Sequence, residues 1–263
     1  IIRDNTVTGG QAILVNDDGT IVSPNSPAPV FSYLGTINNT ATDSYLLFAN
    51  GSNEESGRGS ITLQGPGATP FEDTGSGILL QSVDTTVSVS GASLASTGPN
   101  AISINGGSGA FSFNDMNITG GTQSSVLIID RAAAGDTTTF SNLTINNPNT
   151  TAFGFQSASG GTMTIGGISS IETASTTLSA IQTFDNGNAA AVLNFTLQSV
   201  TSANTNVLAT WTNPPFGAIS LDNSSGDIRI QSVFDVGGSD GTGLNVQNNS
   251  TVNVYKQGLL ISP

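Results

Sequence analysis

The sequence predicts an all-β fold, specifically a β-solenoid in which short strands are wound into stacked coils. Apolar and polar residues alternate with period two in many short runs, and no window shows the spacing of an amphipathic helix. These runs come in groups of three, and the groups recur at a nearly constant spacing. Paired glycines separate the runs, which indicates tight corners between the strands.

The clearest group covers residues 101–121, AISINGGSGAFSFNDMNITGG. It contains three alternating runs, Ala101–Ile104, Ala110–Phe113 and Met116–Ile118, separated by Gly, Asn and Asp. The breaks are too short for helices and are rich in residues that tolerate turn conformations. Alternation predicts that one set of side chains points into the core: Ile102, Ile104, Phe111, Phe113, Met116 and Ile118.

The same group can be aligned along the chain by treating Ile78, Ile102, Val126, Phe153 and Ile181 as equivalent. The steps between them are nearly equal and fall in the range of about 20 to 30 residues that is typical of stacked coils. The next step is ambiguous, because either 207–211 or 218–221 opens the following coil. The distance from Ile219 to Leu244 matches the regular step and favours the second. The runner-up architecture is an antiparallel β-sandwich, which also uses evenly spaced short strands.

One β-helix domain is predicted over residues 1–263. Residues 1–76 form irregular early coils, with strands at 11–15, 45–48 and 61–63, a Pro-rich loop at 23–28 and a polar loop at 51–59. Residues 77–263 form regular coils of about 24–28 residues, with an insertion near 203–217.

Glycine and asparagine are expected at the corners of the coils. Five glycine pairs fit this role, because glycine adopts positive φ without strain. They begin at Gly106, Gly120, Gly160, Gly166 and Gly237. The asparagine pairs 146–147 and 248–249 are also assigned to corners, where their side chains would form ladders.

Composition excludes several classes of chemistry. The chain has no histidine and no cysteine, which removes imidazole triads, disulfides and thiolate sites, and we expect no cofactor and no metal. The net charge is −13, and the five basic residues are far apart in the sequence, so neither nucleic acid nor an anionic membrane surface is an expected partner. No apolar run is long enough to span a membrane, so this fragment is not expected to insert directly.

Carboxylates form only small groups. Asp130 is followed by Arg131, and Asp222 is near Asp227 and Arg229; Asp185 would lie at the same corner as Asp222 one coil away. A polysaccharide hydrolase needs two such acids in one cleft. The favoured interpretation is instead that these side chains cap turns.

Two oxygen-rich turns, at 16–19 and 237–241, resemble calcium loops, and the second faintly matches a nonapeptide calcium repeat. Each occurs once, so a turn without metal is favoured. Thr pairs at 6–8 and 162–164 resemble ice-binding faces, but such faces need the pair at every coil. Threonine on a strand surface accounts for them.

Trp211 is the single tryptophan and is close to Phe216 in the longest late interruption of the repeat. Loops that project from a rigid scaffold often carry recognition residues. We therefore name Trp211 and Phe216 as candidate contact residues. The alternative is that both rings pack back onto the rod.

The repeated alternating runs and glycine corners from Ile78 to Ile261 resemble the right-handed parallel β-helix, which has three short strands per coil. This fold occurs in the pectate-lyase-like superfamily and in bacterial autotransporter passengers. Residues 9–13, GGQAI, and residues 111–114, FSFN, are similar to the GGA[ILV] and FxxN repeats of chlamydial polymorphic outer-membrane proteins, apart from the inserted Gln11. The resemblance implies an exported protein.

The expected function is that of a non-enzymatic adhesin or stalk, secreted or displayed on a bacterial outer membrane by a region outside this sequence. Its partner would be a host-cell or matrix protein or a glycan. The chain begins without Met and without a signal peptide, so we expect it to be a fragment of a longer protein. The alternative is a carbohydrate-active β-helix, a lyase or hydrolase, with an acidic cleft across several coils.

Overall fold

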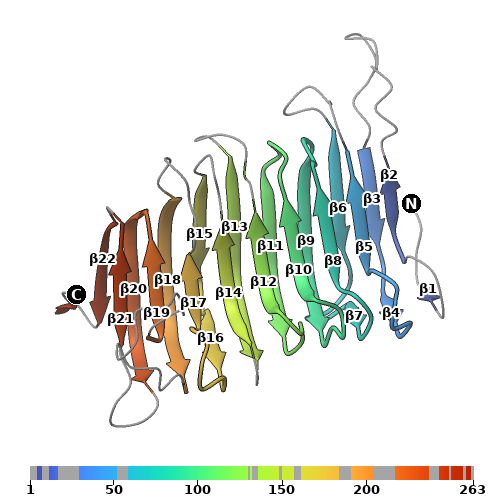
Figure 1. The fold of residues 1–263 in the computed structure, drawn as a ribbon. Coiled ribbons are helices and arrows are strands. Elements are labelled where there is room, and N and C mark those ends of the chain that lie inside the picture. The colour runs from blue at the N-terminus through green and yellow to red at the C-terminus, as the bar shows by residue number, and fades with distance from the viewer. Residues whose placement is uncertain are drawn as a thin grey trace.

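The computed structural model describes residues 5–7, 12–16, 30–51, 59–129, 131, 136–147, 150–156, 161–183, 191–203, 217–236, 243–248, 250–256 and 259–261. Across these residues the structure is all β, with no helix, and the strands stack side by side into an elongated rod (Figure 1). The first and last strands lie at opposite ends of this rod. The predicted parallel β-solenoid is therefore confirmed.

One side of the rod is a nine-stranded parallel sheet, which we call face 1. Each coil contributes one short strand to it, and successive strands pair in the order of the chain. Its strands are β2 (Leu14–Asn16), β5 (Leu47–Asn50), β8 (Ile78–Gln81), β10 (Asn100–Asn105), β12 (Ser124–Ile129), β14 (Thr151–Gln156), β17 (Ile181–Thr183), β19 (Ile219–Asp222) and β21 (Leu244–Gln247).

The other two sides belong to a fourteen-stranded sheet that bends. Face 2 is made by β3 (Val30–Leu34), β6 (Ser60–Gln64), β15 (Thr162–Gly166), β22 (Thr251–Lys256) and the first halves of five long strands. Face 3 is made by β1 (Asn5–Val7), β4 (Ile37–Asn39), β7 (Phe71–Asp73), β16 (Ser170–Thr173) and the second halves of those strands. The long strands are β9 (Thr86–Leu94), β11 (Phe111–Ile118), β13 (Thr137–Asn147), β18 (Ala191–Ser202) and β20 (Ser224–Val236).

The strand register confirms the alignment made from the sequence. Ile78 pairs with Ile102, Ile102 with Val126, Val126 with Phe153, and Phe153 with Ile181. Nearly all pairings are parallel, so the antiparallel sandwich is wrong. The exception is β23 (Leu259–Ile261), which pairs antiparallel with β22.

The ambiguous coil is also resolved. Ile181 pairs with Ile219, and Ile219 with Leu244, so the strand at 219–222 opens the coil as the spacing favoured. Most of the expected insertion near 203–217 lies outside the described residues. The connection from Ile181 to Ile219 is much longer than the earlier steps of the repeat, which leaves room for it.

In five coils the expected second and third strands are one continuous strand that turns a corner. In three of them the turn is made by a residue with positive φ: Gly91 at 77°, Asp115 at 53° and Asn142 at 53°. Between β15 and β16, Gly167 at 69° continues the same column along the rod. Glycine, Asp and Asn are the residues that adopt this conformation at least cost, which explains the column.

Corner side chains form a short ladder in this column. Asn142 Nδ2 donates to Asp115 Oδ1 at 2.8 Å, and the backbone N–H of Ile168 donates to Asn142 Oδ1 at 3.0 Å. The ladder was expected at the pairs 146–147 and 248–249 instead. Asn146 lies within β13 opposite Glu172, so the prediction of a corner there is wrong, whereas Asn248 does adopt a positive φ of 46°.

The early coils contain strands that the sequence did not predict, namely β1, β3, β4 and β7. Leu47 pairs with Ile78, a longer step than those between the middle coils, so the early coils join the same stack with longer connections. The alternation is hidden in β3 because Val30 and Phe31 are adjacent apolar residues, and in β7 because the strand has three residues, with Phe71 between Pro70 and Glu72.

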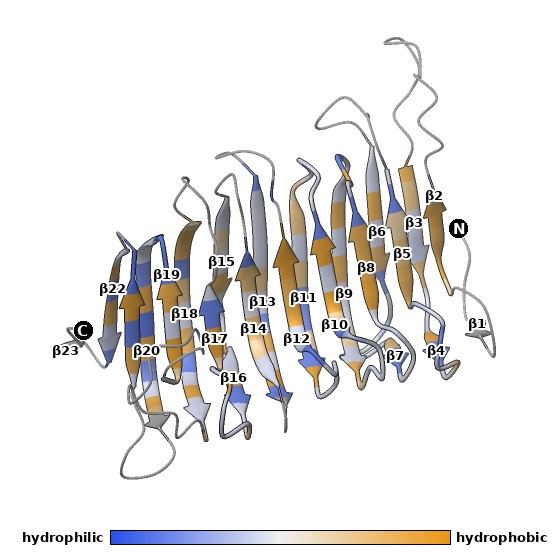
Figure 2. Cartoon of the chain, in the orientation of Figure 1, coloured by the Kyte–Doolittle hydropathy of each residue, from blue (hydrophilic) through white to orange (hydrophobic). Residues whose placement is uncertain are grey.

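Inside the rod, aromatic rings stack from coil to coil. Phe113 and Phe140 have ring centroids 5.0 Å apart, and Phe153 meets both Phe140 and Phe195 edge to face at 5.6 Å. All four rings are buried. Such aromatic pairs add about 1 kcal/mol each beyond area burial, and Figure 2 shows the alternation of hydrophobic and hydrophilic residues along the strands that builds this core.

One carboxyl group is buried where face 3 turns toward face 1. Asp73, 1% exposed, accepts hydrogen bonds from Asn39 Nδ2 and from the backbone N–H of Gly77. Ser44 Oγ donates to Asn39 Oδ1 at 2.6 Å, which orients the amide. Burial raises the pKa of Asp73 to about 6, because desolvation outweighs the hydrogen bonds that favour the ionised form.

Candidate interaction face

The outward side chains of face 2 form the most regular surface of the rod, which we call the polar face. Its central column has one residue from each coil, and every one carries a hydroxyl, amide or carboxylate group. The pairings make the column unbroken through nine strands. In order, its residues are Ser32, Thr62, Ser88, Ser112, Thr139, Thr164, Asn194, Asp227 and Asn253.

Two further columns flank the central one. Both are mostly polar and uncharged, with apolar side chains at Val30, Leu34, Val192 and Ala110, the last lying between Thr86 and Thr137. Among the described residues of the three columns, only Asp227 and Arg229 are charged, and they pair with each other. One flanking column runs through Val30, Ser60 and Thr86, then Thr137, Thr162, Val192, Ser225 and Thr251; the other runs through Leu34, Gln64, Ser90, Asn114, Ser141 and Gly166, then Thr196, Arg229 and Tyr255.

Hydroxyl groups have different roles on the polar face and at the corners. Corner hydroxyls bond the backbone: Ser96 Oγ donates to the carbonyl of Gly75 at 3.0 Å, and Ser179 Oγ donates to that of Gly217 at 2.6 Å. Within the described residues, the hydroxyls of Ser112, Thr139 and Thr164 have no hydrogen-bond partner in the protein. The polar face therefore presents donors and acceptors that the fold itself does not use.

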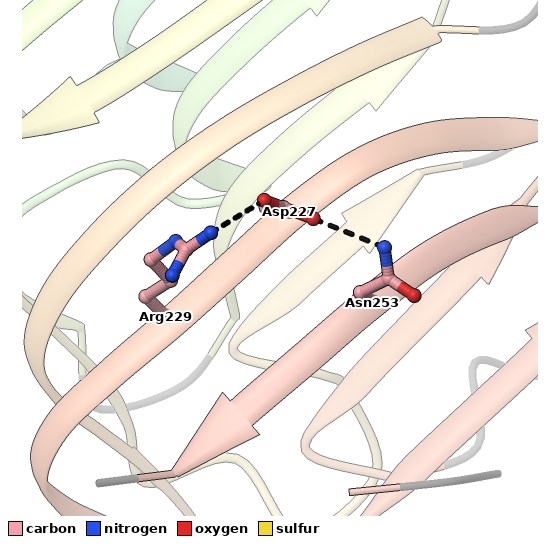
Figure 3. A network of polar contacts seen from close by, with 3 residues as sticks. All are labelled: Asp227, Arg229 and Asn253. Atoms are coloured by element: carbon pink, nitrogen blue, oxygen red, sulfur yellow. Dashed lines mark hydrogen bonds and ion pairs between the residues drawn. The ribbon is translucent and has the colours of Figure 1, made fainter. Parts of the chain in front are cut away.

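At the C-terminal end of the central column, Asp227, Arg229 and Asn253 form a polar network (Figure 3). Arg229 Nη2 donates to Asp227 Oδ2 at 2.8 Å, and Asn253 Nδ2 donates to Asp227 Oδ1 at 3.1 Å. The Asn253 and Arg229 hydrogen bonds lower the pKa of Asp227, so this carboxylate is ionised at neutral pH. Arg229 also lies 4.9 Å from the ring centroid of Tyr255.

The other two faces differ in character. Face 3 carries the exposed carboxylates Glu72 and Glu172 on its outer side. Face 1 carries an outward column that begins with Leu14, Phe48 and Leu79, of which Leu14 is 57% exposed. Only face 2 combines an unbroken register with an almost uncharged polar surface among the described residues.

Arg131, which was grouped with Asp130 in the sequence, is buried and stabilises the fold through bonds to backbone carbonyls. It is 1% exposed, and its guanidinium donates to the carbonyl of Gly107 at 2.9 Å and to that of Gly109. The group also lies 4.3 Å from the ring centroid of Phe111. Burial lowers the pKa of Arg131, but such a group stays protonated.

Two acidic residues of the described chain bond to the following coil, whereas the favoured interpretation expected them to cap their own turns. Asp84 accepts from the backbone N–H of Ser108 at 2.7 Å, and Asp222 accepts from Asn248 Nδ2 at 2.6 Å. Of the proposed group, Asp227 and Arg229 do meet, on the polar face, whereas Asp222 lies at the preceding corner. No group of three or more acidic residues suited to a metal is found in the described part.

Several candidate residues lie outside the described residues. These are Trp211 and Phe216, the carboxylates Asp130 and Asp185, the turn at 237–241, and most of the turn at 16–19 and of the loop at 51–59. Of the Thr pairs, Thr162 and Thr164 align with Thr137 and Thr139, but the next coil presents Val192 and Asn194. The pair is not repeated at every coil, as the sequence indicated.

The polar face as a continuous surface is missed by the sequence analysis, which notes the outward Thr pair at 162–164 but does not follow its column into the other coils. The signal was available: once the inward residues are aligned, the residue between two inward positions of each coil is hydroxylic in six successive strands. These residues are Ser32, Thr62, Ser88, Ser112, Thr139 and Thr164.

Comparison with known proteins finds no matching family model, no matching curated protein and no matching solved structure. Among the described residues, no helix has the length and apolar character needed to cross a membrane. The fold thus defines the chain as a parallel β-solenoid and assigns it to no family.

Proposed function

We propose that this chain is an interaction rod of the autotransporter-passenger type, a secreted or surface-exposed bacterial adhesin that presents its faces and loops to a host-cell or matrix component. The observation that carries the proposal is the polar face, whose central column continues through nine strands without a break in register. A surface of this kind is built once per coil and is held by the whole stack.

Rigidity supports the same function. The described coils are bonded to their neighbours through both sheets, and their inward residues fill a continuous core. Stacking at about 4.8 Å per coil holds surface groups at fixed spacing along the rod. A stalk or adhesin needs this combination of length and fixed presentation.

The proposal is tested with beads that carry the purified rod, counted after incubation with cultured epithelial cells and with immobilised matrix proteins. The expected result is retention well above that of beads carrying the same chain after heat unfolding. Equal retention of folded and unfolded chain, or none on any surface, would overturn the proposal. A protease-accessibility assay on intact bacteria that produce the protein tests the surface location.

A further inference from the structure

We propose that the polar face binds an uncharged, extended polysaccharide that lies along the rod axis and crosses successive coils. This inference rests on the proposed function and names the ligand class of the interaction surface. It is carried by three independent properties of that face: its charge, its unused hydrogen-bonding groups, and its spacing.

Charge sets the ligand class. The chain has a net charge of −13, yet the polar face has one carboxylate and one guanidinium, which neutralise each other 2.8 Å apart. An acidic polysaccharide finds no unpaired cation among the described residues of the three columns, because Lys256 at the end of β22 is in register with the inward Ile230 and lies outside them. The negative net charge of the chain also repels such a polymer. A basic polymer would prefer the carboxylates of face 3. An uncharged ligand is the one that this surface accepts without an electrostatic penalty.

The hydrogen-bonding groups match the surface of a sugar. Hydroxyls both donate and accept, and the amides of Asn194 and Asn253 offer both functions in one plane. Sugar hydroxyls have the same dual character. Within the described residues the hydroxyls of Ser112, Thr139 and Thr164 are not used by the fold, so a ligand replaces only water when it binds.

Spacing extends these contacts along the rod. Successive members of the central column are neighbours on adjacent strands, about 4.8 Å apart. This repeat is comparable with the length of one hexose unit in an extended glycan. Each sugar can therefore meet one coil. At the C-terminal end, Asp227 offers a carboxylate that is held by Arg229 and Asn253, and the guanidinium of Arg229 lies over the ring of Tyr255.

Native gel electrophoresis with a polysaccharide cast into the gel tests the inference. The probes are hydroxyethylcellulose and galactomannan, which are uncharged, and polygalacturonate and heparin, which are acidic. We expect the mobility of the rod to fall with increasing concentration of at least one uncharged probe, and to be unaffected by both acidic ones.

The diagnostic variant replaces Thr139→Val and Thr164→Val together. Valine keeps the branched shape and the strand preference and removes two adjacent hydroxyls from the central column. We expect the dissociation constant for the uncharged probe to rise about five- to tenfold, as for the loss of one or two hydrogen bonds. The matched control is Thr119→Val with Thr144→Val, two exposed threonines on the face 3 side, one just after β11 and one in β13, and it should leave binding unchanged.

Four results would overturn the inference. The first is the absence of binding to either uncharged probe, and the second is equal weakening by both variant pairs. The third is a dimer in sedimentation that the Thr139→Val/Thr164→Val pair dissociates, which would assign the face to a second copy of the chain. The fourth is bead binding to host surfaces that survives periodate oxidation of the glycans. Circular dichroism of each variant checks that the fold is kept. If beads bind host surfaces but binding survives periodate oxidation of the glycans, the glycan inference fails while the proposed function stands. If the rod binds glycans but the beads are retained on no host surface, the glycan inference stands and the proposed function fails.

Discussion

Asp73 gives the sharpest test of the energetics of this fold. Its pKa rises from 3.8 to about 6 on folding, because the carboxyl is removed from water. One pKa unit corresponds to about 1.4 kcal/mol, so burial disfavours the ionised form by about 3 kcal/mol. Between about pH 4 and about pH 6 the folded chain keeps a proton that the unfolded chain releases. The contribution of Asp73 to the free energy of unfolding is therefore greatest below about pH 4 and falls as pH rises to about 6.

The perturbation is Asp73→Asn, which keeps the shape and removes the titration. The free energy of unfolding is measured in urea at several pH values from about 4 to about 7. The advantage of the wild type over Asp73→Asn should shrink by about 3 kcal/mol as pH rises across this range.

If the difference between wild type and Asp73→Asn stays constant with pH, or grows as pH rises, the reasoning from burial is refuted.

Three further substitutions, with Arg229→Ala as a control for one of them, test the core and the corners by urea denaturation. Phe153→Ala removes a ring packed edge to face between two others and should destabilise the rod by about 3 to 5 kcal/mol; a loss below about 1 kcal/mol would contradict that packing. Arg131→Ala should destabilise by about 3 kcal/mol or more, because buried carbonyls lose their donor, whereas the exposed Arg229→Ala should change stability by less than about 1 kcal/mol. Gly167→Ala should destabilise by about 1 to 3 kcal/mol, since its φ is 69° and the new Cβ would collide with Asn142 Oδ1; an unchanged midpoint would show that the corner relaxes.

Period-two alternation was sufficient to predict the solenoid and the register of its middle coils. The equivalence of Ile78, Ile102 and Val126 follows from spacing alone, because parallel stacking keeps each inward residue above its predecessor. The same rule failed where strands are short. β4 and β7 pair Ile37 with Phe71, but each strand has too few alternations to be recognised.

Side-chain roles were harder to predict than strands. Arg131 was only grouped with its neighbour Asp130, because sequence does not show that its long side chain turns inward to the carbonyls of Gly107 and Gly109. Asp73 gave no signal at all, since its burial depends on the contact with Asn39 in the coil before it. The pairing of Asp227 with Arg229 was predictable, since alternation places residues two apart on the same side of a strand.

The step from Ile181 to Ile219 is much longer than the step from Ile78 to Ile102, yet both pairs are direct partners in the same sheet. The length of chain between two coils is thus independent of how the coils pair. We therefore expect that a guest peptide or a small folded domain inserted between Ala203 and Gly217 leaves the pairing of Ile181 with Ile219 intact. An insertion of this kind would present its guest at a fixed position along the rod axis.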